Sequence, residues 1–125
     1  LSADTLGSKS TAIGLQALAN QNFTTATDVF NTAIGFQAGL TVSTGVENTL
    51  IGALAGDALT SGQQNVALGA YALTTDTLGS KSVALGRLAL ADQNFTTATD
   101  THNVAVGFAA GGDITTGTQT TIIVA

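Results

Sequence analysis

The stretch Asn31-Thr32-Ala33-Ile34-Gly35 decides the fold, because closely similar stretches recur along the whole chain of 125 residues. The glycines that close the six intact copies are Gly14, Gly35, Gly52, Gly69, Gly86 and Gly107. Their sequence numbers differ in turn by 21, 17, 17, 17 and 21, and a seventh copy begins at Thr120. A recurrence at fixed spacings of this size is typical of small structural units stacked in a row.

Each repeat is too short for a strand, a crossover helix and a second strand, but it has room for two short strands and two turns. Side chains alternate between the two faces of a strand, so Thr32 and Ile34 point to one side and Ala33 and Gly35 to the other. One face is bulky and the other is flat, and both are free of charge, which is typical of a strand covered on both sides. We predict an all-β fold, a parallel β-roll or β-solenoid of about seven rungs. Which face points inward stays open.

The repeats are themselves grouped into a larger unit. Residues 4–39 and 76–111 match at 26 of 36 positions, and their numbers differ by 72, so three short rungs and one long rung make one super-repeat. Residues 1–125 are expected to form a single repetitive module. The chain has no methionine and its seventh repeat is cut short, so we expect it to be a fragment of a longer fibre chain.

Two positions of the repeat are assigned structural roles. Gly45 and Gly62 stand three positions before the motif asparagine, and Asp28 and Asp100 take that place in the longer repeats. Glycine adopts positive φ freely, and Asp is among the next best choices, so we predict a left-handed turn there, with positive φ at Gly62. The motif asparagines are expected to form a side-chain ladder along the stack. These asparagines are Asn31, Asn48, Asn65 and Asn103.

The extra residues of the long repeats fall in two segments of identical sequence, 21–27 and 93–99. We expect them to form loops that project from the stack, and loops on a rigid scaffold are where recognition is usually placed. The candidate recognition residues are Asn22, Phe23, Thr24, Thr25, Asn94, Phe95, Thr96 and Thr97.

The charge balance excludes several kinds of partner. The net charge is −5, and Lys9, Lys81 and Arg87 are the only lysines and arginines, so phosphate-driven binding of nucleic acid has almost no electrostatic basis. No apolar run approaches the ~20 residues that span a bilayer, and no membrane insertion is expected. The absence of cysteine excludes disulfides, cysteine-ligated zinc and thiol nucleophiles.

No arrangement of nucleophile, base and paired carboxylates stands out, so we predict no enzymatic activity, no catalytic residues and no cofactor. His102 is the sole histidine, and it takes the place that Phe30 has in the first long repeat. It is a tolerated substitution on a loop or packed face, or it forms a ring of three imidazoles around a trimer axis that binds a metal ion. It is the one candidate metal ligand.

The pattern N-[TV]-A-[ILV]-G-x-x-A-[GL] resembles the head repeats of trimeric autotransporter adhesins, whose signature is close to N-S-V-A-I-G. It is equally similar to the N-T-A-I-G repeats of bacteriophage tail fibres. The resemblance covers nearly the whole chain and implies a left-handed parallel β-roll, assembled as a trimer, with an attachment role at a virion tail or cell surface. The adhesin heads repeat more tightly than even the short repeats of this chain, which favours the phage fibre or another extracellular filament.

The expected function is therefore a structural and adhesive fibre module, extracellular, that presents loops to a host receptor or glycan. A homotrimer is expected because a single coil can bury only one face of each motif strand in its interior. The second apolar face would otherwise form an exposed stripe along the stack. The alternatives are a bacterial trimeric adhesin head, a monomeric solenoid that binds glycan or ice, and a spacer without a binding role.

Overall fold

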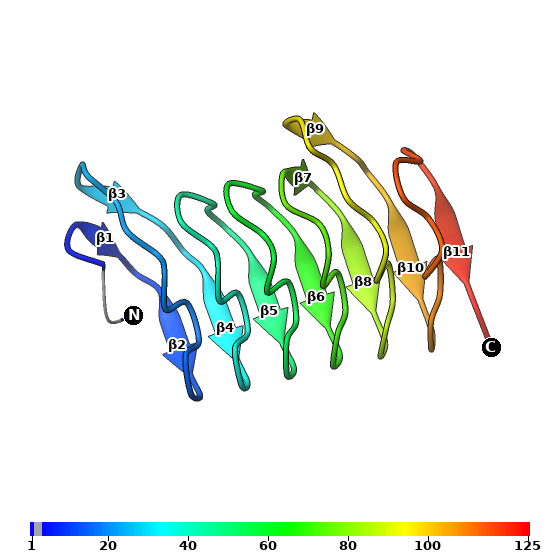
Figure 1. Ribbon diagram of the computed structural model, residues 1–125, viewed down its shortest axis with the longest axis horizontal. Coiled ribbons are helices and arrows are strands. Elements are labelled where there is room, and N and C mark those ends of the chain that lie inside the picture. Colours follow the sequence, from blue (N-terminus) through cyan, green and yellow to red (C-terminus); the bar gives the residue numbers. More distant parts are fainter. Residues whose placement is uncertain (2–3) are drawn as a thin grey trace.

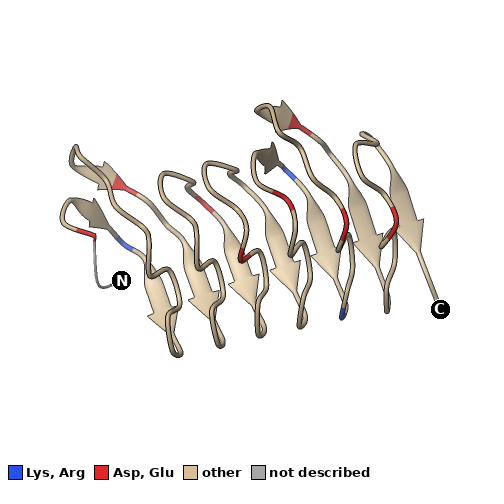
Figure 2. Ribbon diagram, viewed as in Figure 1, with Lys and Arg blue, Asp and Glu red and all other residues tan. Residues whose placement is uncertain are grey.

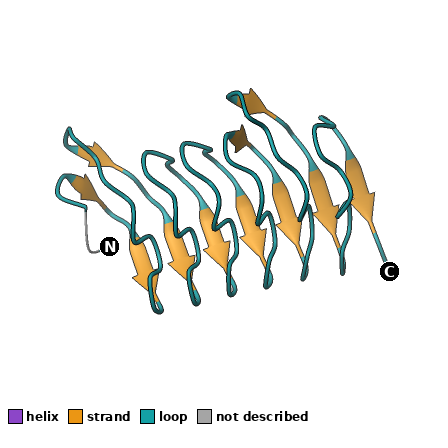
Figure 3. Cartoon of the chain, in the orientation of Figure 1, coloured by secondary structure: helices purple, strands orange, loops and turns teal. Residues whose placement is uncertain are grey.

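The computed structural model describes residue 1 and residues 4–125, and this part of the chain consists of strands and turns without a helix (Figure 3). The strands are β1 Gly7–Ser8, β2 Thr11–Ile13, β3 Thr27–Asp28, β4 Thr32–Ile34, β5 Thr49–Ile51, β6 Val66–Leu68, β7 Gly79–Ser80, β8 Val83–Leu85, β9 Thr99–Asp100, β10 Val104–Val106 and β11 Thr121–Ile123. Seven of them form one sheet in the order β11-β10-β8-β6-β5-β4-β2 (Figure 1). The predicted all-β solenoid of about seven rungs is confirmed.

Equivalent residues of successive rungs lie side by side. All strand pairs are parallel, and the motif strands keep one register, with Thr32 opposite Thr49 and Ile34 opposite Ile51. The backbone N–H of Gly35 donates to the carbonyl of Ile13 at 2.8 Å, one rung back. The long rungs add the two-stranded pairs β1–β3 and β7–β9. Each rung is thus joined to its neighbours by a backbone ladder in constant register.

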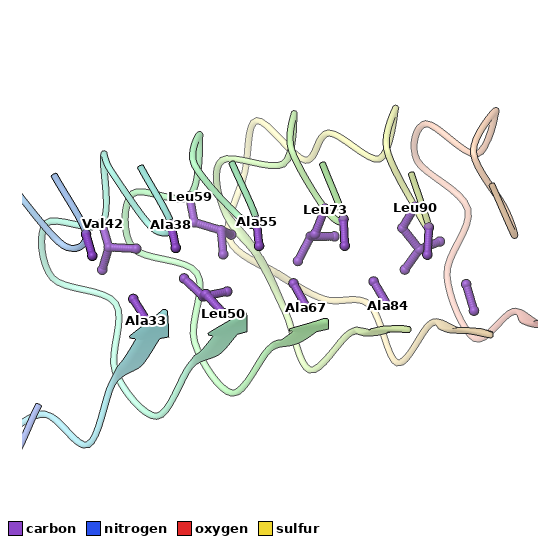
Figure 4. Close-up of a cluster of buried hydrophobic side chains, with 14 of the residues drawn as sticks. Ala33, Ala38, Val42, Leu50, Ala55, Leu59, Ala67, Leu73, Ala84 and Leu90 are labelled. Atoms are coloured by element: carbon purple, nitrogen blue, oxygen red, sulfur yellow. The ribbon is translucent and has the colours of Figure 1, made fainter. Parts of the chain in front are cut away.

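The flat face of the motif strand points inward. Ala33, Ala67 and Ala84 are fully buried, and they face a second row of side chains that comes from the returning half of each rung (Figure 4). The bulky face, with Ile34 and its equivalents, points outward. The core is therefore thin, and small residues line one of its two walls.

Large and small residues exchange places between the two walls. In the turn that follows the motif glycine, Gly56 of one rung corresponds to Leu73 of the next. Where Gly39 and Gly56 occupy this position, the strand opposite carries Leu50 in place of alanine, and a Cβ on either glycine would lie 2.7 Å from a Leu50 methyl carbon. Leu50 thus fills the space that both glycines leave, so large and small residues compensate one another across neighbouring rungs, as close packing requires.

The motif glycines permit the rungs to approach each other. Gly52 has φ +134°, a conformation open mainly to glycine. A Cβ there would lie 2.6 Å from both the carbonyl carbon and the oxygen of Gly69 in the next rung. Gly14, Gly35, Gly69, Gly86 and Gly107 share this geometry, each against the backbone of its own neighbour.

The turn before the motif differs from expectation. The prediction of positive φ at Gly62 is wrong, because the left-handed residue of this turn is Gln64, two positions later, with φ 59°. The similar prediction for Asp28 and Asp100 is wrong for the same reason. Gly62 is required for another reason: a Cβ on it would lie 2.3 Å from the carbonyl oxygen of Gly79. In every rung, the left-handed residue of this turn lies directly before the motif asparagine, serine or threonine. These residues are Lys9, Phe30, Glu47, Gln64, Lys81, His102 and Gln119.

The motif asparagines form a ladder of a different kind from the amide-to-amide ladder expected. The Asn48 side chain accepts a hydrogen bond from the backbone N–H of Asn65 at 3.0 Å and donates to the carbonyl of Gly62 at 2.9 Å. Asn31 bonds in the same way to Asn48 and Gly45. Each buried amide thus satisfies backbone groups of the next rung, which are otherwise left without partners at the turn.

Candidate functional site

The extra residues of the long rungs lie in loops next to β3 and β9 that extend past the neighbouring turns (Figure 1). Most of the candidate recognition residues are exposed, and these are Asn22, Thr24, Thr25, Asn94, Thr96 and Thr97. The side chains of Phe23 and Phe95 are buried. The polar members are therefore available to a partner, whereas the two phenylalanines anchor their loops to the body of the solenoid.

A buried carboxylate holds the base of the second loop. Asp76 is fully buried and accepts hydrogen bonds from the backbone N–H of Gly79 at 3.1 Å and of Phe95 at 3.0 Å. The side chain of Gln93 donates to the second oxygen of Asp76 at 2.6 Å and to the hydroxyl of Ser82 at 2.9 Å. This network ties the loop to the preceding rung, and it fixes where the exposed part of the loop begins.

The first loop repeats this arrangement near the start of the chain. Asp4 accepts from the Gln21 side chain at 2.5 Å and from the backbone N–H of Gly7 at 2.8 Å. Desolvation of Asp4 opposes its ionisation, but the hydrogen bonds from Gln21, Gly7 and Phe23 outweigh it and hold the pKa of Asp4 below its ordinary value.

An exposed ion pair beside the loop joins each long rung to the rung before it. The Lys9 ammonium lies 2.6 Å from Asp28, and the Lys81 ammonium lies 2.5 Å from Asp100. The hydrogen bond from Lys9, followed by one from the Ser8 hydroxyl at 2.8 Å, lowers the pKa of Asp28. Exposed pairs of this kind contribute little to stability, but they neutralise both lysines locally.

Acidification from about pH 5 to about pH 2 is expected to reduce the free energy of unfolding. The pKa values of Asp4 and Asp28 are lowered in the folded chain, so the stability they contribute is present above the ordinary aspartate pKa and is lost as the pH falls through the folded-state values. Urea unfolding followed by circular dichroism at several pH values measures the loss. The double variant Asp4→Asn, Asp28→Asn should show a shallower pH dependence, and an unchanged slope would contradict the assignment.

The outward side of the seven-stranded sheet is a largely apolar face, which we call the outward face. It has three columns along the stack: Thr or Val at the first strand residue, Ile, Leu or Val at the third, and the residue after the motif glycine. The middle column is half-buried to exposed, with Leu68 at 47% and Ile123 at 74%. Its members are Ile13, Ile34, Ile51, Leu68, Leu85, Val106 and Ile123.

Arg87 is the charged exception in the third column of this face. It directly follows Gly86 at the turn after β8, where Figure 2 shows a basic residue. Its guanidinium carbon lies 5.9 Å from the ring centroid of Tyr71 and 5.7 Å from that of Phe108, on the rungs before and after. Both rings are exposed, Tyr71 at 40% and Phe108 at 65%. In the described part of the chain Arg87 forms no ion pair, unlike the two lysines.

The grouping of Arg87 with Tyr71 and Phe108 is absent from the sequence-based candidates. The sequence does contain a signal for it. Side chains alternate between the two faces of a strand, so Val83 and Leu85 share one face, and the same alternation continued past Gly86 places Arg87 on that face. Phe108 follows from the same alternation one rung later. The overall charge balance alone does not reveal the grouping.

His102 is exposed and left-handed, with φ 52°, and lies on the outside of the long rung directly before Asn103. Within residue 1 and residues 4–125, no group of three or more His, Asp or Glu side chains is placed to hold a metal ion. A ring of three His102 side chains would require three chains, and it stays a prediction.

None of the described segments is a helix long and apolar enough to cross a bilayer. Comparison of the chain with protein-family models, with curated proteins and with solved structures found no significant match in any of the three.

Proposed function

We propose that this chain is a non-enzymatic structural and adhesive module of an extracellular fibre, and that three copies assemble side by side along the solenoid axis. The observation that supports this most directly is the outward face, whose middle column is apolar on every one of the stacked motif strands. Soluble monomers rarely expose a contiguous apolar surface of this extent. The resemblance of the motif to phage tail-fibre repeats adds the attachment role and the virion or cell-surface location.

Copies of the same chain are the partner that fits the face best. Its middle column presents one branched aliphatic side chain per rung, at the regular spacing of about 4.8 Å that the parallel ladder imposes. A second solenoid aligned with the first has the same spacing, so its side chains can interdigitate along the whole length. The chains carry a net charge of −5 each, and the outward strand residues carry none of it, so burial of apolar surface would have to drive association.

Leu68→Asp is expected to dissociate the assembly without unfolding the chain. Leu68 lies on β6 in the middle of the outward face and is 47% exposed in the single chain, so a carboxylate is tolerated by the monomer but is desolvated in an interface. Light scattering after size-exclusion chromatography should give about three times the 12.3 kDa chain mass for the natural sequence, and one chain mass for the variant.

Thr24→Asp is the matched control, since Thr24 is exposed on a projecting loop away from the sheet. It should leave the mass unchanged. Circular dichroism of both variants separates loss of assembly from loss of fold. A natural chain that remains monomeric at micromolar concentration would overturn the trimer, whatever the variants do.

A monomeric solenoid that binds ice is the second candidate, and one feature of the outward face favours it. Thr11, Thr32 and Thr49 form the first column over three successive rungs, as a flat and regular row of hydroxyl and methyl groups. Measurable thermal hysteresis from a monomeric sample would select this function over the fibre. Particle mass distinguishes a glycan-binding monomer from the trimeric fibre, whereas a bacterial trimeric adhesin head is distinguished from a phage fibre by the ligand that it binds.

A further inference from the structure

We propose that Arg87, Tyr71 and Phe108 form a binding site for a carboxylated sugar, such as a uronic acid within a polysaccharide. The inference rests on the proposed attachment role, for which it names a site and a class of ligand. The site lies on the turns after β6, β8 and β10, in and beside the third column of the outward face, whereas the proposed trimer contact is made by the middle column.

The first argument is that Arg87 has no anionic partner among the described residues. On a chain with eight acidic residues, both lysines are engaged by aspartates at 2.6 and 2.5 Å, but Arg87 has no carboxylate partner among the described residues. The residue is exposed, and its guanidinium presents a planar fork of N–H donors. A carboxylate can accept two parallel hydrogen bonds from such a fork, which is stronger and more directional than a contact to a lysine.

The second argument is the pair of aromatic rings that flank the cation. Tyr71 and Phe108 belong to the rungs on either side of Arg87, and their centroids lie 5.9 and 5.7 Å from its guanidinium carbon. These contacts restrain the long arginine side chain, which reduces the conformational entropy lost when a ligand binds. The C–H face of a pyranose ring can lie on an exposed aromatic ring, so the flanking rings favour a sugar over a simple carboxylate.

The third argument is the small size of the side chains that precede Arg87 in the third column of the outward face. In the two preceding rungs the same position is held by Ala70 and Ala53, and the rung before those carries Phe36. The column is therefore low over two rungs, between Phe36 and Arg87, a span of about 14 Å across three rung spacings. This length suits two or three linked sugars lying along the stack. No aspartate or glutamate occupies this column, so an acidic chain meets no like charge there.

The test is a titration of the 15N-labelled natural chain with tetragalacturonic acid, followed by backbone amide shifts. We expect saturable shifts at the turns after β6, β8 and β10, and weakening by about tenfold or more in Arg87→Gln, since one charge-assisted bidentate contact is lost. Tyr71→Ala and Phe108→Ala should weaken binding as well. Lys81→Gln is the control: it removes a cation that is already paired with Asp100, and it should bind as the natural chain does.

Three further probes decide between ligands. The methyl ester of the same tetrasaccharide should bind much more weakly, because it has lost its charges. Equal binding of the ester would overturn the proposal, because recognition would then need no carboxylate. Equal binding of sodium acetate would show that no sugar ring is needed, and equal binding of a short polyglutamate peptide would show that no carbohydrate is needed, so either result would overturn it as well. Absence of any saturable shift with tetragalacturonic acid would also overturn it.

Mass and binding are read on the same samples, so the two proposals fail separately. A trimer that does not bind the tetrasaccharide refutes this site and leaves the fibre module standing. A monomer that binds it supports the site and refutes the trimeric assembly.

Discussion

Gly69→Ala is expected to abolish cooperative folding of the solenoid or to lower the free energy of unfolding by about 3 kcal/mol or more. Two costs add at this position. The backbone of Gly69 has φ +139°, where a side chain is strained whatever space surrounds it. The new Cβ would also lie 2.6 Å from the carbonyl carbon and oxygen of Gly86 and 2.9 Å from the Arg87 nitrogen. All three are backbone atoms, and they can move only if the neighbouring rung moves.

Gly117→Ala is the matched control for this prediction. Gly117 lies outside the left-handed region, and the nearest atom to an added Cβ is a methyl carbon of Ile114 at 3.4 Å, an ordinary contact. This variant should unfold within about 1 kcal/mol of the natural chain, since exposed surface substitutions seldom do more. Urea denaturation followed by far-ultraviolet circular dichroism compares the two. Equal midpoints for both variants would contradict the role assigned to the motif glycines.

Asp76→Ala is expected to cost about 3–5 kcal/mol, because it removes the partner of several buried donors at once. The backbone N–H groups of Gly79 and Phe95 and the side-chain amide of Gln93 all donate to this carboxylate. Without it the base of the second loop is left with unsatisfied polar groups, and the aromatic anchor Phe95 is no longer fixed. The melting temperature measured by calorimetry should fall accordingly.

Asp92→Ala provides the comparison for Asp76→Ala. Asp92 directly precedes the second loop but is exposed, so its removal should change the melting temperature little. The amide exchange rates of Gly79 and Phe95 add a local measurement, and they should rise in Asp76→Ala alone. Slow exchange at both amides in Asp76→Ala would contradict the role assigned to this carboxylate.

The strand stack could be predicted because its physical causes are local and repeated. Residues 32–34 alternate bulky and small side chains, and the regular spacing of the short repeats allows equivalent residues to pair in register. Which face points inward could not be decided from the strand alone, since Ile34 and Ala33 are both apolar. The answer depends on Leu73 and Leu90 of the returning segments, which fill the interior and leave room only for alanine opposite them.

The turn and the loops show why other details could not be predicted. Glycine at position 62 is compatible with two causes, a left-handed backbone or a close approach, and only the position of Gly79 one rung later decides for the second. The burial of Phe23 depends on Asp4, in the preceding rung, which accepts a hydrogen bond from its backbone N–H. Such partners are distant in the sequence, and the repeat pattern does not identify them.

The constant register of the seven motif strands has an evolutionary consequence. Since each rung contacts only the rungs before and after it, a gene segment that encodes one super-repeat can be duplicated or deleted without creating a new type of contact inside the stack. Each such event would lengthen or shorten the particle by four rungs, or about 19 Å. The near identity of residues 4–39 and 76–111 is the trace that one such duplication would leave. Related genes are then expected to differ in length by multiples of this unit.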